Sequence, residues 1–167
     1  MHAFKPITLV FLLLSSLVQA DIGLSEVKIE ALSPLDITYM AQQRQTIADL
    51  VGRHTGSRLK GSEVDIPNLQ LLIDRRIIKP ADQAQMQALG LTLGDVLANK
   101  LDMRWIVYID RRGRSKALRL SNTNNYLFPI TMLSRRANGG ADISVREIYD
   151  KAVAKMQPYI KKGPFDY

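Results

Sequence analysis

The residues with the clearest capacity for chemistry are basic, and they gather in two places along the chain. The first group stands around one predicted turn and comprises Arg111, Arg112, Arg114, Lys116 and Arg119. The second group is the adjacent pair Arg135 and Arg136. Guanidinium groups present several N–H donors in a fixed fork that matches carboxylate and phosphate oxygens. The pattern therefore predicts an anion-binding surface, although charged residues at such positions also serve solubility and protect strand edges.

Carboxylates are the other side chains that would do chemistry here, and Asp95 is the first candidate. It interrupts an otherwise apolar helical stretch, whereas Asp102 and Asp110 have the positions of a helix-end residue and a turn residue. The sequence identifies no second carboxylate as its partner in a general acid–base pair. Two interpretations of Asp95 stay open: the exposed flank of a helix, or the acid or base of a small hydrolase or transferase.

Several classes of site lack the residues they need. The chain has no cysteine, which excludes a disulfide framework, a thiolate zinc site and a thiol nucleophile. His54 is the single histidine beyond the predicted leader, so a site of clustered histidines is excluded too. EF-hand, P-loop, dinucleotide-binding and serine-hydrolase motifs are not found. We predict no metal and no cofactor, and we favour a protein that is not an enzyme, with the Asp95 alternative left open.

Residues 1–20 have the features of a secretory signal peptide. Lys5 provides a positive start, an apolar stretch follows, and Ala20 places a small residue at the cleavage position. A membrane-spanning helix needs about 20 apolar residues, which this stretch does not reach. We expect cleavage between Ala20 and Asp21, export to the periplasm or beyond, and no transmembrane span in the mature chain.

The net charge narrows the classes of partner. The 167-residue chain carries a formal net charge of +7, and its calculated pI is about 9.8. Anions accessible to an exported bacterial protein are envelope components with anionic head groups and acidic partner proteins. We therefore expect an anionic envelope component or a protein partner and no nucleic acid, because a net charge supports arguments about association. The sequence gives no indication of the oligomeric state.

Helices are predicted on both sides of a strand region. Ser33, Pro34 and Asp36 form a capping-box start for a helix over residues 34–55, which Gly56 ends. A short helix follows from Asp65, and an amphipathic helix covers residues 81–101. A last helix begins after Ser144. Gly90 and Gly94 interrupt the residue 81–101 helix four positions apart, which predicts the close approach of another backbone.

Three strands are predicted over residues 105–109, 115–120 and 126–133. Gly113 supplies the turn between the first two, and Asn125 lies in the polar loop before the third. Pro129 cannot donate to a ladder, so the third strand is placed at an edge or a bulge. In a meander, Arg135 and Arg136 would reach the end of the sheet where the hairpin arginines lie, and the strand would point them to opposite faces. We call this combined surface the basic rim.

These elements predict an α+β domain with N-terminal helices, a three-stranded antiparallel meander, and a C-terminal helix packed on the sheet. Residues 21–33 are expected to form an N-terminal arm. Residues 34–160 form the single domain, and residues 161–167 form a flexible tail.

Several short segments, in order, have a recognisable likeness. They are residues 91–95 (LTLGD), 105–108 (WIVY), 110–114 (DRRGR), 117–119 (ALR), Asn125, 127–129 (LFP) and 134–136 (SRR), with 40–44 (MAQQR) further upstream. In this combination the chain resembles a bacterial family known only as domain of unknown function 3806. The resemblance covers most of the mature chain and implies one compact α+β domain. It implies no catalytic residue.

The sequence thus favours an exported, non-enzymatic binding module whose basic rim holds an anionic group or a partner protein. The predicted binding residues are Arg111, Arg112, Arg114, Arg119, Asn125, Arg135 and Arg136. The alternatives are the hydrolase or transferase with Asp95, and an inhibitor or immunity-type protein that plugs another enzyme.

Overall fold

The first half of the domain is helical. The structure, a computed structural model, describes residues 27–139 and 142–160, so the predicted leader and tail lie outside the described residues. The helix α1 (Pro34–Thr55) begins with the predicted capping box, and Gly56 ends it in the left-handed conformation. A turn of 3-10 helix, η1 (Glu63–Asp65), leads into the short helix α2 (Ile66–Asp74). The amphipathic helix α3 (Gln83–Leu101) follows, with Asp82 as its N-cap.

The sheet has four antiparallel strands in the order β1-β2-β3-β4. The strands β2 (Met103–Asp110) and β3 (Gly113–Leu120) form the predicted hairpin, and Gly113 takes a φ of 112° at its turn. The predicted α+β class is correct. However, the sheet has one strand more than predicted, because β1 (Lys28–Glu30) of the expected N-terminal arm pairs with β2.

The predicted third strand over residues 126–133 is wrong in its extent. The strand β4 contains only Tyr126–Leu127, and the helix α4 (Pro129–Asn138) begins two residues later. Proline has a fixed φ that suits the first helical position, and it cannot donate a ladder hydrogen bond. Arg135 and Arg136 therefore lie on a helix, about 100° apart around its axis, instead of on opposite faces of a strand.

The last helix, α5 (Val145–Met156), begins as predicted after Ser144, whose hydroxyl accepts a hydrogen bond from the Glu147 N–H. A short 3-10 turn, η2 (Gln157–Tyr159), follows it. Instead of packing on the sheet as expected, α5 packs mainly on α2 and α3, and α3 contacts β2 and β3 directly. None of the helices in the described part of the chain has the length and apolar character needed to cross a bilayer.

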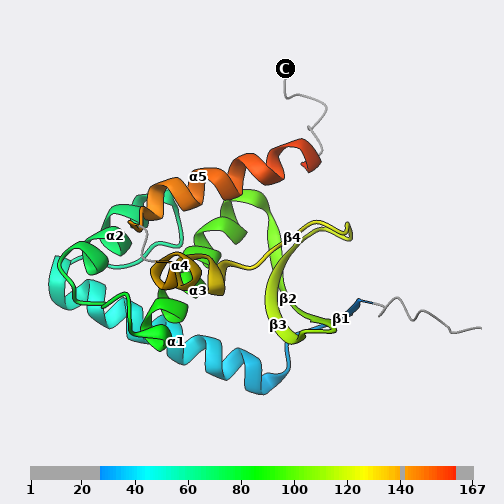
Figure 1. The fold of residues 1–167 in the computed structure, drawn as a ribbon, viewed down its shortest axis with the longest axis horizontal. Helices are drawn as coiled ribbons and strands as arrows, with labels where there is room; N and C mark the ends of the chain where they lie inside the picture. The colour runs from blue at the N-terminus through cyan, green and yellow to red at the C-terminus, as the bar shows by residue number, and fades with distance from the viewer. Residues whose placement is uncertain (1–26, 140–141, 161–167) are drawn as a thin grey trace, which may run out of the picture.

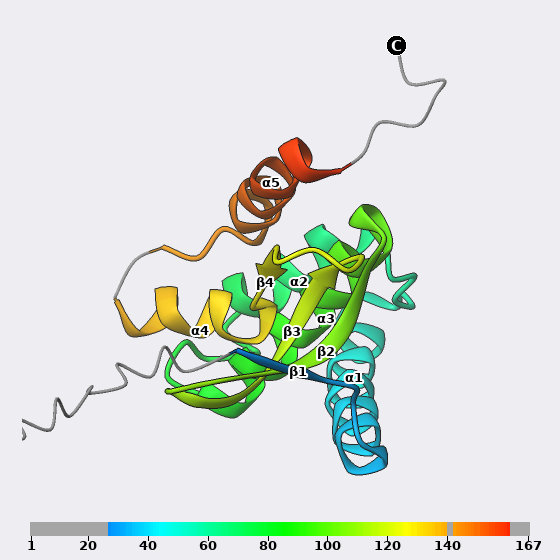
Figure 2. The ribbon, with the colours of Figure 1, turned by 90° about the vertical axis from the view of Figure 1, so that its right-hand side faces the viewer.

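The domain has a helical layer on one face of the sheet (Figure 1). Figure 2 views the sheet from its other face, where no described helix lies in front of the strands. The core fills the space between the layers, and Leu93, Leu97 and Leu118 are among its fully buried residues. The sheet therefore has a covered face, on which α1, α3 and α4 meet the strands, and an open face.

Gly90 and Gly94 explain how α4 comes to lie against α3. A Cβ atom at Gly90 would lie 2.6 Å from the Pro129 carbonyl oxygen, and one at Gly94 would lie 2.5 Å from the Trp105 ring. The predicted close approach of another backbone is confirmed at Gly90. Hence the two glycines allow α4 to pack at a distance from α3 that side chains would prevent.

Candidate functional site

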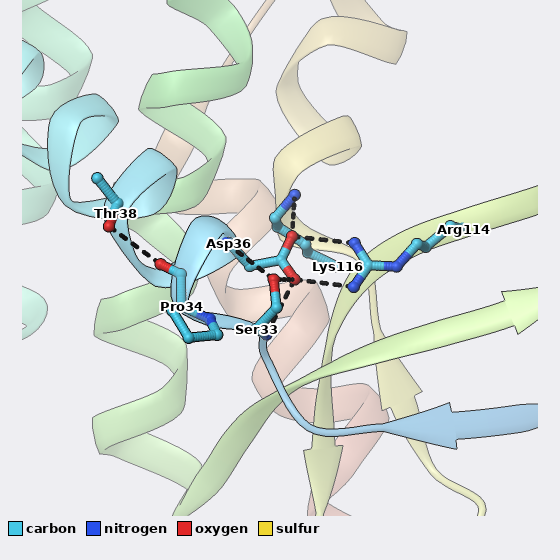
Figure 3. Close-up of polar contacts among 6 residues, drawn as sticks. All are labelled: Ser33, Pro34, Asp36, Thr38, Arg114 and Lys116. Carbon is cyan, nitrogen blue, oxygen red and sulfur yellow. Dashed lines mark hydrogen bonds and ion pairs between the residues drawn. The ribbon is translucent and has the colours of Figure 1, made fainter.

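A buried carboxylate organises the region where α1 meets the hairpin. Asp36 lies in the first turn of α1 and is 6% exposed. Its two oxygens accept hydrogen bonds from both terminal nitrogens of Arg114, at 3.0 and 2.8 Å, and Lys116 Nζ lies 3.3 Å away (Figure 3). Ser33 donates from its hydroxyl at 2.7 Å and from its backbone at 3.0 Å. The capping box of α1 thus also fixes two cations of β3.

The surroundings of Asp36 strongly favour its charged form. The bidentate Arg114 guanidinium is the main reason that the pKa of this carboxyl lies far below its usual range, and the Ser33 hydroxyl adds to the effect. Burial acts in the opposite direction, since it disfavours a charged group, but it does not prevail. Asp36 therefore remains an anion across the ordinary pH range and keeps Arg114 and Lys116 in place.

A pocket of 220 Å³ opens beside this ion cluster. It lies between the β3 edge and α4, and its lining residues are Tyr39, Gln87, Arg114, Ser115, Lys116, Phe128, Ile130, Thr131 and Arg135. The Lys116 ammonium lies 5.0 Å from the centre of the Tyr39 ring, a cation–π distance. We call this hollow the basic pocket, because three cations line it and Asp36 is the carboxylate that is ion-paired with two of them.

Arg135 differs from the other two cations. It is exposed on α4, and its guanidinium forms no hydrogen bond or ion pair with another residue of the described chain. Its neighbour Arg136 points to another groove, between α4 and α5, where its Nη1 lies 3.4 Å from Glu147 Oε2. Arg135 also lines that groove, but because its guanidinium has no partner among the described residues, it is the group at the basic pocket best placed to receive an external anion.

The structure brings together some of the predicted site residues and separates others. Arg114 and Arg135 meet at the basic pocket. Arg111 and Arg112 lie at the hairpin turn, where Arg112 N–H donates to Asp110. Arg119 lies towards the far end of β3 and donates to the carbonyls of Asn122 and Thr123, in the loop that also holds Asn125. The predicted rim is therefore not one surface, because its arginines divide between the pocket, the turn, the loop and the α4–α5 groove.

Tyr39 and Lys116 line the pocket and Asp36 is ion-paired with two of its cations, but none of these three residues belongs to the predicted binding set. Lys116 had a usable signal, since residues two apart in a strand share a face and it follows Arg114 by two. The sequence pattern assigns Asp36 only to the helix cap. Its pairing with a guanidinium 78 positions further along the chain has no local pattern.

Asp95 is held in a second cluster. It accepts hydrogen bonds from Arg44 Nε and Nη2, at 2.6 and 2.8 Å, and from the Trp105 indole at 2.9 Å. It also lines a pocket of 280 Å³ together with Asp65 and Thr92. The carboxylate already has three strong donors, which tie α1, α3 and β2 together, so its contacts are those of a structural ion pair.

We expect Asp95→Asn to lower the free energy of unfolding by about 1–2 kcal/mol, because it removes the charge that Arg44 and Trp105 both bind. Urea denaturation followed by the fluorescence of the single tryptophan would measure the loss. The control is Asp102→Asn, an exposed C-cap with a φ of 50°, which asparagine also adopts readily. Equal stability of the two variants would contradict a structural function of Asp95.

Fold and site together define a small α+β domain with one helical layer and a basic pocket at a strand edge. The chain belongs to the family described as Domain of unknown function (DUF3806), whose family model matches residues 65–149. A crystal structure from Bacteroides thetaiotaomicron VPI-5482 has the same fold, with a TM-score of 0.70 and 19% sequence identity. The alignment covers 79% of this chain and 49% of that chain, so this chain spans about half of its length. A comparison with curated proteins finds no match.

Proposed function

We propose that this protein is a non-enzymatic binding module of the bacterial envelope that holds an anionic group in the basic pocket. The observation that carries the proposal is that Arg135, whose guanidinium has no partner among the described residues, lines one hollow together with Arg114 and Lys116. With Asp36 as the carboxylate bound to that cluster, the three cations leave an excess of positive charge. Arg114 uses its two terminal nitrogens at Asp36 and keeps further N–H donors.

The shape and lining of the pocket suit one carboxylate or phosphate group with a small apolar part. Its volume is 220 Å³, and Tyr39, Phe128 and Ile130 add apolar surface to the charged side chains. The Asp36 cluster holds Arg114 and Lys116 before any ligand arrives, so little side-chain freedom is lost on binding. Export by the predicted leader belongs to the proposal, and it would place the pocket among envelope anions.

Binding is better supported than catalysis by Asp95. That carboxylate is already bound by Arg44 and Trp105, whereas Arg135 is exposed and its guanidinium has no partner in the described part of the chain. Arg114 and Lys116 are held in place by Asp36, and together with the Arg135 guanidinium they form an arrangement that can bind an anion.

Arg135→Gln is expected to weaken anion binding at least tenfold, because a charge-assisted hydrogen bond contributes about 1.5–3 kcal/mol. Isothermal titration of residues 21–167 with N-acetylglutamate, glycerol phosphate and inorganic phosphate, at low and high salt, would measure the affinities. Arg136→Gln is the matched control, since the neighbouring arginine pairs with Glu147 in the other groove. Equal affinities of both variants and the parent chain, or no binding of any probe, would refute the proposed function.

A further inference from the structure

The basic pocket lies beside a strand edge that has no partner strand in the part of the chain that the structure describes. The strand β3 has eight residues, but β4 pairs only with its last part, through Leu118 with Leu127 and Arg119 with Tyr126. At Gly113, Arg114, Ser115 and Lys116 no described strand follows β3 on that side. The first three of these residues are exposed. The first half of β3 is therefore an edge to which no described strand is paired.

The hydrogen-bonding groups that face this edge follow from the ladder. The Leu120 N–H donates to the Asn125 carbonyl at 3.1 Å, so Leu120 points its backbone groups towards β4. Backbone groups alternate along an antiparallel strand, so those of Leu118, Lys116 and Arg114 point the same way. Continuing the register of β4 would place Pro129 opposite Lys116. Proline has no N–H, and the chain turns there into α4, so on this side Lys116 and Arg114 have no strand partner among the described residues.

The basic pocket lies beside this edge, between β3 and α4. Ser115 and Lys116 line it from the strand, and Thr131 and Arg135 line it from α4. An extended peptide can add a strand to an exposed sheet edge, with its main chain paired to the edge strand and its alternate side chains in flanking pockets. The Arg114, Lys116 and Arg135 side chains at the basic pocket favour a bound segment with acidic side chains, because opposite charges on neighbouring strands attract.

We infer that the anionic ligand is an acidic segment of a partner protein, bound in extended conformation as an added strand on the free edge of β3. The inference rests on the proposed function, since the acidic side chain of the segment occupies the basic pocket. The main chain of the segment pairs with Arg114 and Lys116 and continues the line of β4 towards the hairpin turn. Affinity then comes from backbone pairing, and selectivity comes from the three cations.

The first test is amide hydrogen exchange on residues 21–167 with a series of acetylated pentapeptide amides, valine and threonine at four positions and glutamate at each position in turn. The N–H groups of Arg114 and Lys116 should exchange fast in the free protein and become protected with the best peptide. The Ala117 N–H faces β2 by the same alternation, so it should be protected in both states and serves as the internal control.

Affinities separate the inference from the function on which it rests. The best peptide should bind at least tenfold more tightly than N-acetylglutamate amide, and N-methylation of its backbone should remove that gain. If every peptide binds only as well as N-acetylglutamate amide, the result supports anion binding in the basic pocket but refutes the added strand on β3. If neither the peptides nor the amide bind, the proposed function fails as well. Protection of Arg114 and Lys116 that depends on protein concentration without peptide would overturn the inference in favour of a second copy of the chain.

Discussion

Substituting alanine for Gly90 is expected to lower the free energy of unfolding by about 1–2 kcal/mol, although alanine is the better helix former. The new methyl group would lie 2.6 Å from the Pro129 carbonyl oxygen and 2.8 Å from that of Ile130. Both atoms belong to the backbone at the start of α4, which cannot rotate away. Overpacking usually costs about 1–3 kcal/mol, and two backbone oxygens within 3 Å place this site in the upper part of that range, so the gain of about 1 kcal/mol in helix propensity offsets only part of it. Urea denaturation of both proteins measures the difference.

The same substitution at Gly52 of α1 provides the matched control. Its Cβ would have only the Ser57 carbonyl oxygen nearby, at 3.9 Å, an ordinary contact distance. Gly52→Ala should therefore stabilise the protein by about 0.5–1 kcal/mol. Because Gly90→Ala displaces α4, it should also move Arg135 and weaken anion binding. A stabilising Gly90→Ala variant would show that α4 does not lie as close to α3 as described.

Replacing Asp36 by asparagine is the change expected to disturb the site most directly. Asparagine keeps the shape of the side chain but removes the negative charge, so Arg114 and Lys116 lose their counterion and the capping box of α1 is weakened. Breaking a fully buried ion pair costs about 3–5 kcal/mol. The Arg114 side chain is 44% exposed, and solvent screens it, so we expect a smaller loss of about 2 kcal/mol in the free energy of unfolding.

The pH dependence of stability provides a second measurement on the same variant. The pKa of Asp36 is lower in the folded chain than its usual value, so the unfolded chain binds a proton more readily. The stabilisation from Asp36 is complete above about pH 4 and is lost progressively as the pH falls below that value. Urea denaturation between pH 2.5 and pH 7 should show that the parent chain has a higher free energy of unfolding than Asp36→Asn, and that this difference becomes smaller below about pH 4.

Asp49→Asn is the control for both experiments. Asp49 lies on α1 as Asp36 does, but it is exposed, and its side chain accepts a hydrogen bond from Gln45. Its replacement should change stability by less than about 0.5 kcal/mol. An Asp36→Asn variant that matches this control at pH 7 would mean that the ion cluster of Figure 3 contributes little to stability.

Local signals in the sequence predicted most of the helices. The residues that begin α1 and α5 form hydrogen bonds with backbone groups within one turn, so a short stretch of sequence is enough to recognise their pattern. The stripe of α3 and the turn at Gly113 are equally local. The predicted extent of the third strand is wrong because Tyr126–Leu133 is apolar enough for a strand, while Pro129 is equally suited to begin a helix. The choice depended on α3, whose Gly90 and Gly94 leave room for α4.

The sequence by itself determined the α+β class, the helix caps, the basic character and the residue types from which an anion site is built. These properties depend on neighbours within a few positions or on composition. Only the tertiary structure decided which cations share a pocket. It placed Arg135 of α4 beside Arg114 and Lys116 of β3, turned Arg136 towards Glu147, and bound Asp36 and Asp95 to arginines distant in sequence. The reason is that an ion pair depends on distance in space, and no local pattern encodes the packing that sets that distance.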